Sequence, residues 1–600
     1  MASINVTDNT MTVQLKKWLG LNESPDGDAG IKMGEAAAMR NFRITREGNL
    51  QIRPGYAAVT TLSAGNPVRG MWSGYVGGVF HVLAACGGKV WDINKDTWTA
   101  SVIGTIEDAP THFFGFSKKV YILNGSGYYC WNGKSVVTRV EGYVPTVVTA
   151  ASPGGGGTPL ERVNLLTGKR KAQYSPDGES TVFYLPEAGI DSVDSVIGTN
   201  ISWTVNTTEG TVTFSSAPEK GVNTITIAWT KGSGTQSKIA PMRFSETFNG
   251  STDARVFLYG DGTNETVYSD LDENGNPTAE YFPDMNVIAV DSANTPLTAL
   301  IRHYDRLLAF KSDGAFSINY SAMTLYSAES GSMSVEDTVT AAFYCTPLNR
   351  EIGNEAVGQV RLIDNDPRTL FGGAAYRWAL SSYGSRDERN AKRISDRVES
   401  TLGRFGLSNC VTFDDETVQE YYIVCGDEAV VNNYGTDTWY YYDHFPAVCM
   451  ERVDGELYFG TPDGRIMHCS RQYHSDDTHE IDAYWESGSM DFGMDWRRKY
   501  SANIWVSVEP ESQSRINVTA QSNRKSDYAQ KTVAHSLATF ANADFNHWSF
   551  RTNRKPQVER VRLKVKKFTF YKLIFSSVSA TSTATILGVD FQVRHTGNVK

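Results

Sequence analysis

The chain has 600 residues, of which 40% are hydrophobic and 12% aromatic, and its formal net charge is −10. This length exceeds what a single hydrophobic core supports, so we expect several domains. The acidic balance argues against a tight grip on nucleic-acid phosphates, which needs a basic face. No apolar run reaches the length of a membrane span and no signal peptide follows Met1, so we expect a soluble protein made in a cytoplasm.

The cysteines are odd in number and scattered, and no two of them form a C-x-x-C pair. This pattern predicts reduced thiols rather than a disulfide framework or a structural zinc site. The seven cysteines are Cys86, Cys130, Cys345, Cys410, Cys425, Cys449 and Cys469.

Residues 1–40 are predicted to form an N-terminal arm. Met11 to Leu19 is short and amphipathic, and Gly34 to Arg40 has the length of one or two helical turns. A segment of this size cannot bury a core of its own. We therefore expect the arm either to tuck onto the body of the protein or to reach a neighbouring subunit.

The stretch from Asn41 to Gly55 reads NFRITREGNLQIRPG. It combines a polar–apolar alternation, a Glu-Gly turn, a second alternating run and a Pro-Gly stop. These features predict a β-hairpin, and we call residues 41–55 the hairpin motif. We expect the hairpin to close the first blade of the body that follows, with Arg46 and Arg53 exposed to solvent.

Strand-length runs separated by glycine or Asn/Asp turns begin at Val68 and return after residue 300. Four short strands with an aromatic residue late in the unit, such as Trp439, are typical of a β-propeller blade. The sequence therefore predicts a degenerate propeller body over residues 41–145 and 236–490, with about five or six blades. A helix rich in arginine and aspartate is expected between Ser385 and Ser400.

Two further domains interrupt or follow this body. Glycine-rich linkers at Pro153–Pro159 and Lys231–Thr235 enclose short alternating strands, which predict an inserted β-sandwich over residues 146–235. Alternating runs such as Ala502–Val508 predict a separate C-terminal β-sandwich over residues 491–600. The expected fold class is thus all-β, a degenerate β-propeller with an inserted β-sandwich and a C-terminal β-sandwich domain.

The sequence contains no P-loop, no G-x-S-x-G elbow, no H-E-x-x-H motif and no dinucleotide fingerprint. The acidic spots Asp414–Glu416 and Asp476–Asp477 are interpreted as solvated turns, because paired catalytic acids must converge from different strands. We therefore expect no enzyme, no cofactor and no metal site. One window has metal-ligand residue types but no familiar ligand spacing, and is predicted to be a loop; it contains His468, Cys469, His474 and His479.

A run of arginines and lysines that begins at Arg551 and Arg554 is the main basic feature. In Val561–Val565 the apolar side chains are expected to point one way and the cationic ones the other. One interpretation is a polar strand face, which is usual for half-buried strands. The other is a contact surface that docks onto an acidic neighbouring subunit or touches phosphate transiently, formed by Arg560, Arg562, Lys564 and Lys566.

The pattern N-F-x-I-T-x-x-G-x-L-x-x-R-P-G near the start of a large all-β protein resembles a motif of one group of phage tail proteins. These are the nozzle, tail tubular protein B or packaged-DNA stabilisation proteins. The end of the insert, Gly210 to Trp229, and the C-terminal strands are also similar to this family. The motif residues, which are structural in the family, are Asn41, Phe42, Gly48, Leu50, Arg53, Pro54 and Gly55.

The resemblance implies a protein of the virion tail that is assembled in the host cytoplasm, is not an enzyme and does not contact a membrane. In this family six copies form a ring below the portal and adaptor, which retains packaged DNA and guides its ejection. The implied partners are further copies of the chain, adaptor or head–tail connector proteins, and tail fibre or other tail proteins. Double-stranded DNA would pass through the ring without sequence-specific binding.

Two other classes of function stay open. A carbohydrate- or receptor-binding propeller module of a phage tail would use exposed aromatic side chains as platforms for sugar rings. A propeller glycosidase of the sialidase type would need an arginine cluster and repeated S-x-D-x-G-x-x-W turns. Ser175–Gly178 is the nearest match to such a turn, but it lies in the insert and lacks the tryptophan.

Overall fold

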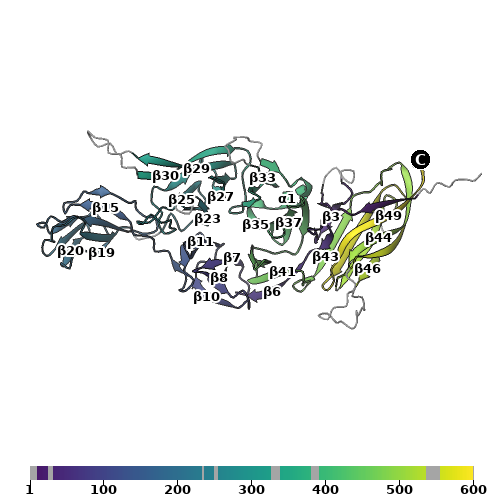
Figure 1. Cartoon of the computed structure of the whole chain (residues 1–600), viewed down its shortest axis with the longest axis horizontal. Coiled ribbons are helices and arrows are strands. Elements are labelled where there is room, and N and C mark those ends of the chain that lie inside the picture. Colours follow the sequence, from purple (N-terminus) through teal and green to yellow (C-terminus); the bar gives the residue numbers. More distant parts are fainter. Residues whose placement is uncertain are drawn as a thin grey trace, which may run out of the picture. The chain divides into compact units, whose positions relative to one another are not determined.

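A computed structural model gives the fold of the chain (Figure 1). The described residues are almost all in strands and turns, which confirms the predicted all-β class. α1 (Glu399–Arg404) is the one α-helix among them. No helix in the described part of the chain is long and apolar enough to cross a membrane. The structure describes residues 10–23, 31–232, 236–248, 254–325, 338–379, 391–511, 513–526, 528–535 and 555–598.

The chain divides into two compact units. The first unit comprises Met1–Val68, Leu370–Arg377 and Lys392–Lys600, and the second comprises Arg69–Thr369 and Trp378–Ala391. The first unit is therefore built from both ends of the chain, whereas the second is nearly continuous in sequence.

The second unit contains four-stranded antiparallel sheets in which strands that follow one another in the chain lie side by side. Their order is that of propeller blades. The first four sheets are β7 (Val68–Val76), β8 (Val79–Cys86), β9 (Lys89–Ile93) and β10 (Ala100–Thr105); β11 (His112–Phe116), β12 (Lys119–Leu123), β13 (Tyr128–Trp131) and β14 (Thr138–Arg139); β23 (Phe244–Phe248), β24 (Arg255–Tyr259), β25 (Glu265–Tyr268) and β26 (Val287–Ala289); and β27 (Leu297–His303), β28 (Arg306–Lys311), β29 (Gly314–Leu325) and β30 (Thr338–Asn349).

Hydrophobic cores lie between successive sheets of this unit. β12 is apolar on both faces, and its side chains divide between two cores. Tyr121 and Leu123 pack in a core shared with β24, whereas Val120 and Ile122 pack in a core shared with β8. The sheets β11–β14, β23–β26 and β27–β30 each contribute to two such cores, which explains why their central strands read as continuous apolar runs.

Residues 146–230 form two small sheets between β14 and β23. Trp229, Tyr174 and Phe183 fill the core between these sheets. β22 is buried at every second residue, which is the alternation that predicted this strand. The larger sheet has the order β16-β15-β17-β22-β19 and the smaller β18-β21-β20, with bounds β15 (Thr146–Ala151), β16 (Thr158–Pro159), β17 (Lys169–Tyr174), β18 (Val182–Tyr184), β19 (Ser192–Ile197), β20 (Trp203–Asn206), β21 (Thr211–Phe214) and β22 (Ile225–Thr230).

Three further blade-type sheets follow, so the described residues contain seven in place of the five or six predicted. The last sheet has only three strands of its own, β39–β41, and β6 (Gly55–Thr61) pairs with β41 as the fourth. The other bounds are β31 (Arg361–Ile363), β32 (Asp366–Phe371), β33 (Ala374–Trp378), β34 (Ala391–Arg393), β35 (Val411–Asp415), β36 (Glu420–Cys425), β37 (Glu428–Asn433), β38 (Thr438–Tyr442), β39 (Cys449–Val453), β40 (Glu456–Gly460) and β41 (Arg465–Ser470).

The C-terminal strands form two sheets that also take in N-terminal strands. One sheet has the order β4-β5-β49-β44-β47, with β1 also paired to β49, and we call it the outer sheet. In the other, β3 and β48 flank β43, followed by β45 and β46. The bounds are β1 (Thr10–Leu15), β2 (Gly20–Leu21), β3 (Glu35–Arg40), β4 (Phe42–Ile44), β5 (Leu50–Ile52), β42 (Ser475–Asp476), β43 (His479–Ser487), β44 (Arg497–Glu509), β45 (Ser514–Ser522), β46 (Lys531–His535), β47 (Gln557–Phe568), β48 (Tyr571–Ser579) and β49 (Thr585–Asn598).

The N-terminal segment is therefore part of the first unit. The predicted arm was expected either to tuck onto the body or to reach a neighbouring subunit. Its described residues pair with strands of the body. The helical turns expected at Gly34–Arg40 are wrong, because Glu35–Arg40 is β3 and pairs with β43. The hairpin motif also lies elsewhere than expected. β4 and β5 extend the outer sheet, and β6, the strand that follows the motif, completes the blade.

The helix predicted at Ser385–Ser400 is confirmed only at its end, where a 3-10 turn at Asp396–Val398 leads into α1. Residues 380–390 lie outside the described residues, Ala391–Arg393 is a strand, and α1 begins only at Glu399. All seven cysteines lie in the described part of the chain, and none of them forms a disulfide there.

Candidate functional site

The hairpin motif is anchored by its apolar side chains. Phe42 on β4 and Leu50 on β5 are fully buried. Between the strands Gly48 has φ 85°, a left-handed conformation that glycine adopts without strain. Its N–H donates to the carbonyl of Thr45 at 2.8 Å, which closes the turn. The Glu-Gly turn and the two alternating runs are thus a hairpin, as predicted.

Asn41, the first residue of the motif, is buried with φ 56°. Its side-chain amide donates to the Asp443 carboxylate and, at 2.9 Å, to the backbone carbonyl of Asp482. Its side-chain oxygen accepts from Arg53 Nε at 2.9 Å. Asparagine tolerates the left-handed region and supplies both a donor and an acceptor, so both features of the residue are used.

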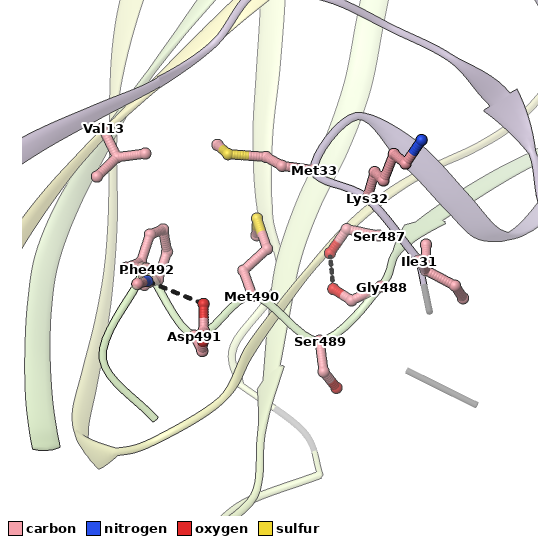
Figure 2. Close-up of a pocket in the computed structure, with 11 residues that line it drawn as sticks. Val13, Ile31, Lys32, Met33, Ser487, Gly488, Ser489, Met490, Asp491 and Phe492 are labelled. Atoms are coloured by element: carbon pink, nitrogen blue, oxygen red, sulfur yellow. Dashed lines mark hydrogen bonds between the residues drawn. The ribbon is translucent and has the colours of Figure 1, made fainter. Parts of the chain in front are cut away.

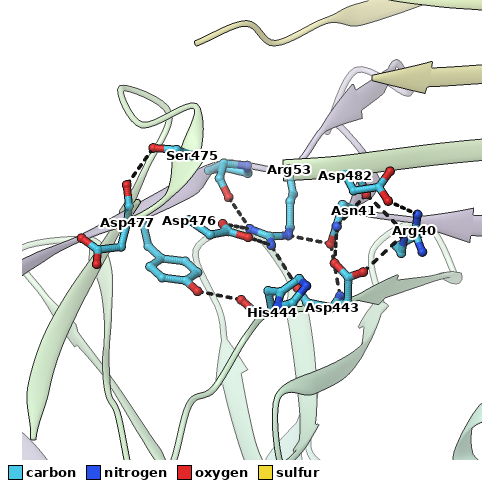
Figure 3. A network of polar contacts seen from close by, with 11 residues as sticks. Arg40, Asn41, Arg53, Asp443, His444, Ser475, Asp476, Asp477 and Asp482 are labelled. Atoms are coloured by element: carbon cyan, nitrogen blue, oxygen red, sulfur yellow. Dashed lines mark hydrogen bonds and ion pairs between the residues drawn. The ribbon is translucent and has the colours of Figure 1, made fainter. Parts of the chain in front are cut away.

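Arg53 is the centre of the network (Figure 3). Its guanidinium forms a bidentate pair with Asp476, with Nη1–Oδ1 2.8 Å and Nη2–Oδ2 2.5 Å. The remaining N–H groups donate to Asn41, to the carbonyl of Pro54 at 3.1 Å and to the carbonyl of Asp443 at 3.0 Å. The guanidinium also lies 5.5 Å from the ring centre of Tyr442. Every donor of this buried side chain is therefore satisfied.

Gly55 ends the motif where no side chain fits. A Cβ atom at this position would lie 2.1 Å from the backbone carbonyl oxygen of Ser475. The Gly55 N–H donates to the carbonyl of Tyr473 at 3.0 Å. The close approach of the two backbones brings Asp476 within reach of Arg53, so the glycine and the ion pair depend on one another.

A second pair of carboxylates borders the network. Arg40, the residue before the motif, pairs with Asp482 on β43 and lies 3.4 Å from Asp443. Tyr56, the residue after it, donates from its hydroxyl to the carbonyl of His444 at 2.7 Å. The motif therefore joins β43, the loop after β38 and β42 into one polar network within the first unit.

Burial and charge pairing shift the pKa values of both members of the Arg53–Asp476 pair. Burial alone would lower the pKa of Arg53, but the Asp476 carboxylate outweighs it and the pKa of Arg53 is raised. Burial raises the pKa of Asp476 against the opposing effect of Arg53. A similar buried pair follows within the motif, where Arg43 lies 4.0 Å from Glu420 and has a raised pKa. Removing one member of such a pair leaves an uncompensated buried charge.

The arrangement supplies no reactive group. The arginine has no unused donor, its carboxylate partner is held in two hydrogen bonds, and the described residues contain no cluster of three His, Cys, Asp or Glu side chains that could hold a metal ion. The site is a structural joint. The structure brings Asn41, Arg53, Pro54 and Gly55 together in it, while Phe42 and Leu50 lie in the core and Gly48 in the turn.

Several sequence interpretations of this region are wrong. Arg53 is buried rather than solvated, and Asp476 is its partner rather than part of a solvated turn. Asp415 is likewise buried and pairs with Arg452. The missed residues Asp443 and Asp476 lie about four hundred positions away, and a lone aspartate in a polar segment carries no signal of a distant buried arginine.

The histidine window is not a loop throughout. His468 and Cys469 lie on β41, and His468 stacks on Tyr458 with ring centres 4.5 Å apart. His479 begins β43. In the part of the chain that the structure describes, these side chains form no metal-binding group.

The basic run falls largely on β47, whose burial alternates as the sequence predicted. The strand pairs only with β44 and is the edge of the outer sheet in the described residues. Arg551 and Arg554 lie outside the described residues. The four predicted contact residues Arg560, Arg562, Lys564 and Lys566 are all exposed.

A small cavity of about 280 Å³ lies in the first unit beside β1 (Figure 2). Val13, Met33, Met490 and Phe492 supply apolar walls, and the loop of residues 487–493 forms one side. The Ser487 hydroxyl donates to the neighbouring Gly488 carbonyl at 2.9 Å. The cavity lies between the N-terminal segment, which contributes Val13 and Met33, and the C-terminal sandwich.

No protein-family model and no curated protein matches this sequence. Solved structures with weak similarity include the computationally designed Ika8 protein, at 9% identity and TM-score 0.31, and the AfRom2 CNH domain, at 6% and 0.33. Each alignment covers 69% of this chain and 99% of the other. An extracellular domain of the putative one-component system BT4673 from B. thetaiotaomicron aligns over 88% of this chain and 80% of its own, at 10% identity and TM-score 0.20.

Proposed function

We propose that the chain is a structural protein of a phage tail, the nozzle below the portal and adaptor that retains packaged DNA and guides its ejection. The observation that carries the proposal is the hairpin motif. Its sequence resembles that of the nozzle family, and its residues form a buried joint with no reactive group. A motif used entirely for holding strands together suits a protein whose task is mechanical.

Two properties of the whole chain support this proposal. The net charge of −10 suits a conduit through which a polyanion must slide, because like charge weakens contact with phosphates. Strands from both ends of the chain pair in the outer sheet, and such closure resists unravelling from either end. In a closed ring each interface also supports the others. We propose a homohexameric ring with a lumen dominated by Asp, Glu and neutral polar side chains.

The test is cryo-electron microscopy of the purified protein, alone and mixed with virion cores that lack it. We expect sixfold rings, wide enough at the centre for duplex DNA, seated on the neck of the particle. A persistent monomer that does not bind the neck would contradict the proposal and favour the receptor-binding propeller. A ring with a continuous basic lining would contradict the proposed lumen.

A further inference from the structure

The solvent face of the outer sheet carries an ordered set of side chains across four strands. In an antiparallel sheet, residues directly opposite one another point to the same face. One row runs from β1 to β47 through Gln14, Asp590, Trp505 and Arg560. A second row runs through Thr10, Arg594, Tyr500 and Lys566. Between them lies the pair of Asn503 and Arg562. We call these residues the outer-face platform.

The platform faces solvent and not a core. The residues that alternate with it, such as Ile504, Phe591 and Val561, are buried on the inner side. Arg560, Arg562 and Lys566 on β47 and Arg594 on β49 are exposed, and none of them forms an ion pair in the described part of the chain. A protein of net charge −10 thus places four cations on one face, with no acidic partner for them among the described residues.

Two aromatic rings lie along the middle strand of this face. Tyr500 and Trp505 on β44 are partly exposed, and each has a cation on β47 directly across from it. Neither ring packs against another aromatic ring among the described residues. Aromatic side chains held at the centre of a polar sheet face offer flat apolar surfaces to a ligand.

Two oxygen atoms beside these rings have no hydrogen-bond partner. They are Asn503 Oδ1 and Asp590 Oδ1, both shielded from water. An acceptor left without a donor costs free energy, so these side chains would gain by turning toward a hydroxyl donor. Asp590 lies directly across from Trp505, so this acceptor adjoins the ring.

We propose that the outer-face platform binds an acidic polysaccharide. Trp505 and Tyr500 would take the apolar faces of sugar rings, and the cations would pair with uronate carboxylates. Asp590 and Asn503 are partly exposed as residues, and on turning toward the ligand they would accept hydrogen bonds from sugar hydroxyls. A nucleic-acid backbone fits less well, because Asp590 at the centre repels phosphate and the DNA backbone has no hydroxyl to donate.

The edge position of β47 accounts for only part of this pattern. Charged side chains, lysine above all, protect edge strands from pairing with other chains. That role requires cations on β47 and nothing on β44 or β49. The aromatic rings and the acceptors lie on these interior strands, so edge protection does not explain them.

The experiment measures binding of polygalacturonate to the full chain by affinity electrophoresis and calorimetry, with dextran, dextran sulfate and poly-dT as comparison polymers. We expect the wild type to bind polygalacturonate and to leave uncharged dextran unbound. Trp505→Ala should weaken binding about tenfold. Arg515→Ala is the matched control, since this exposed arginine lies on β45 of the other sheet and should change nothing.

Asp590→Asn separates the two classes of polymer. If the carboxylate accepts sugar hydroxyls, the variant binds polygalacturonate more weakly than wild type. If the face attracts any polyanion, the loss of negative charge tightens binding of poly-dT and dextran sulfate as well. Failure of the wild type to bind polygalacturonate, or tighter binding by Asp590→Asn, would overturn the proposal. Circular dichroism of each variant checks that the sandwich is folded.

Discussion

Arg53 and Asp476 lie 423 positions apart in the sequence and form a bidentate ion pair whose side chains are 2% and 1% exposed. The pair connects the end of the hairpin motif to β42, two residues before β43 begins. Together with the pairing of β1 and β5 with β49 and of β3 with β43, it joins the N-terminal strands to the C-terminal segment in one folded unit.

Breaking one half of this pair should destabilise the first unit strongly. Asp476→Asn and Arg53→Met should each lower the free energy of unfolding by about 3–5 kcal/mol, because each leaves a buried polar or charged group without its partner. The double variant Arg53→Met/Asp476→Leu should lose less than the sum of the two. Urea unfolding followed by tryptophan fluorescence measures both, with Arg515→Ala as control. Equal stability of Asp476→Asn and wild type would contradict the role of the joint.

The two glycines of the motif should respond differently to alanine. Gly48→Ala places a side chain in open space at a left-handed φ and should cost about 1–2 kcal/mol. Gly55→Ala drives a methyl group into the Ser475 carbonyl and should cost about 3 kcal/mol or prevent folding. Thermal unfolding of the two variants side by side provides the comparison. A smaller effect at Gly55 than at Gly48 would show that the two backbones can separate there.

The N-terminal segment should be required for the sandwich. Trp18 is buried, with its ring 5.1 Å from Trp485 and 6.2 Å from Phe575. Trp18→Ala should lower stability by about 3–5 kcal/mol. Trp496→Ala, at an exposed tryptophan of the same unit, should cost about 1 kcal/mol or less. Deleting residues 1–40 should unfold the sandwich, and a native-like unfolding transition after deletion would refute this.

The stability of the second unit should depend on pH through Glu246. Burial raises the pKa of this carboxyl to about 7 from an ordinary 4.5. The folded state therefore holds the proton, and the stabilisation is complete below the unfolded pKa and is lost as pH rises through about 7. Thermal midpoints between about pH 5 and 8 should fall for the wild type and stay flatter for Glu246→Gln. Glu219→Gln, at an exposed position, is the control and should follow the wild type.

His112 in the same unit makes stability depend on pH in the opposite direction to Glu246, and over a lower pH range. Burial lowers its pKa to about 4 from 6.5, so its contribution is present above 6.5 and is lost as pH falls. Its ring nitrogen lies 3.0 Å from the Ser245 hydroxyl on β23. His112→Gln should therefore reduce the loss of stability below pH 6 while leaving the Glu246 effect unchanged, which the same thermal series would reveal.

Local patterns predicted most strands because each depends only on neighbouring residues. The alternation of Val561–Val565 and of Ile225–Thr230 fixed which side chains are buried before any partner strand was known. The Glu-Gly turn at Gly48 likewise follows from conformational preference alone.

The joint could not be predicted in this way. The local sequence indicates that Arg53 is a solvated residue before a Pro-Gly stop. It is buried only because Ser475 and Asp476 approach it from a distant segment. Glu35–Arg40 has the composition of a helical turn, but it pairs with β43 and is therefore a strand. In both cases tertiary pairing overrides the local preference.

The pairing of β1 with β49 also sets an order of events during synthesis. Thr10 lies opposite Arg594, so β1 finds its partner only after β49 has left the ribosome. The second unit, nearly continuous in sequence, emerges long before that and can fold as it is translated. Until β49 is made, β1 of the first unit has no partner strand. A prematurely terminated chain would leave that strand exposed. Completion of the outer sheet is therefore coupled to the synthesis of β49.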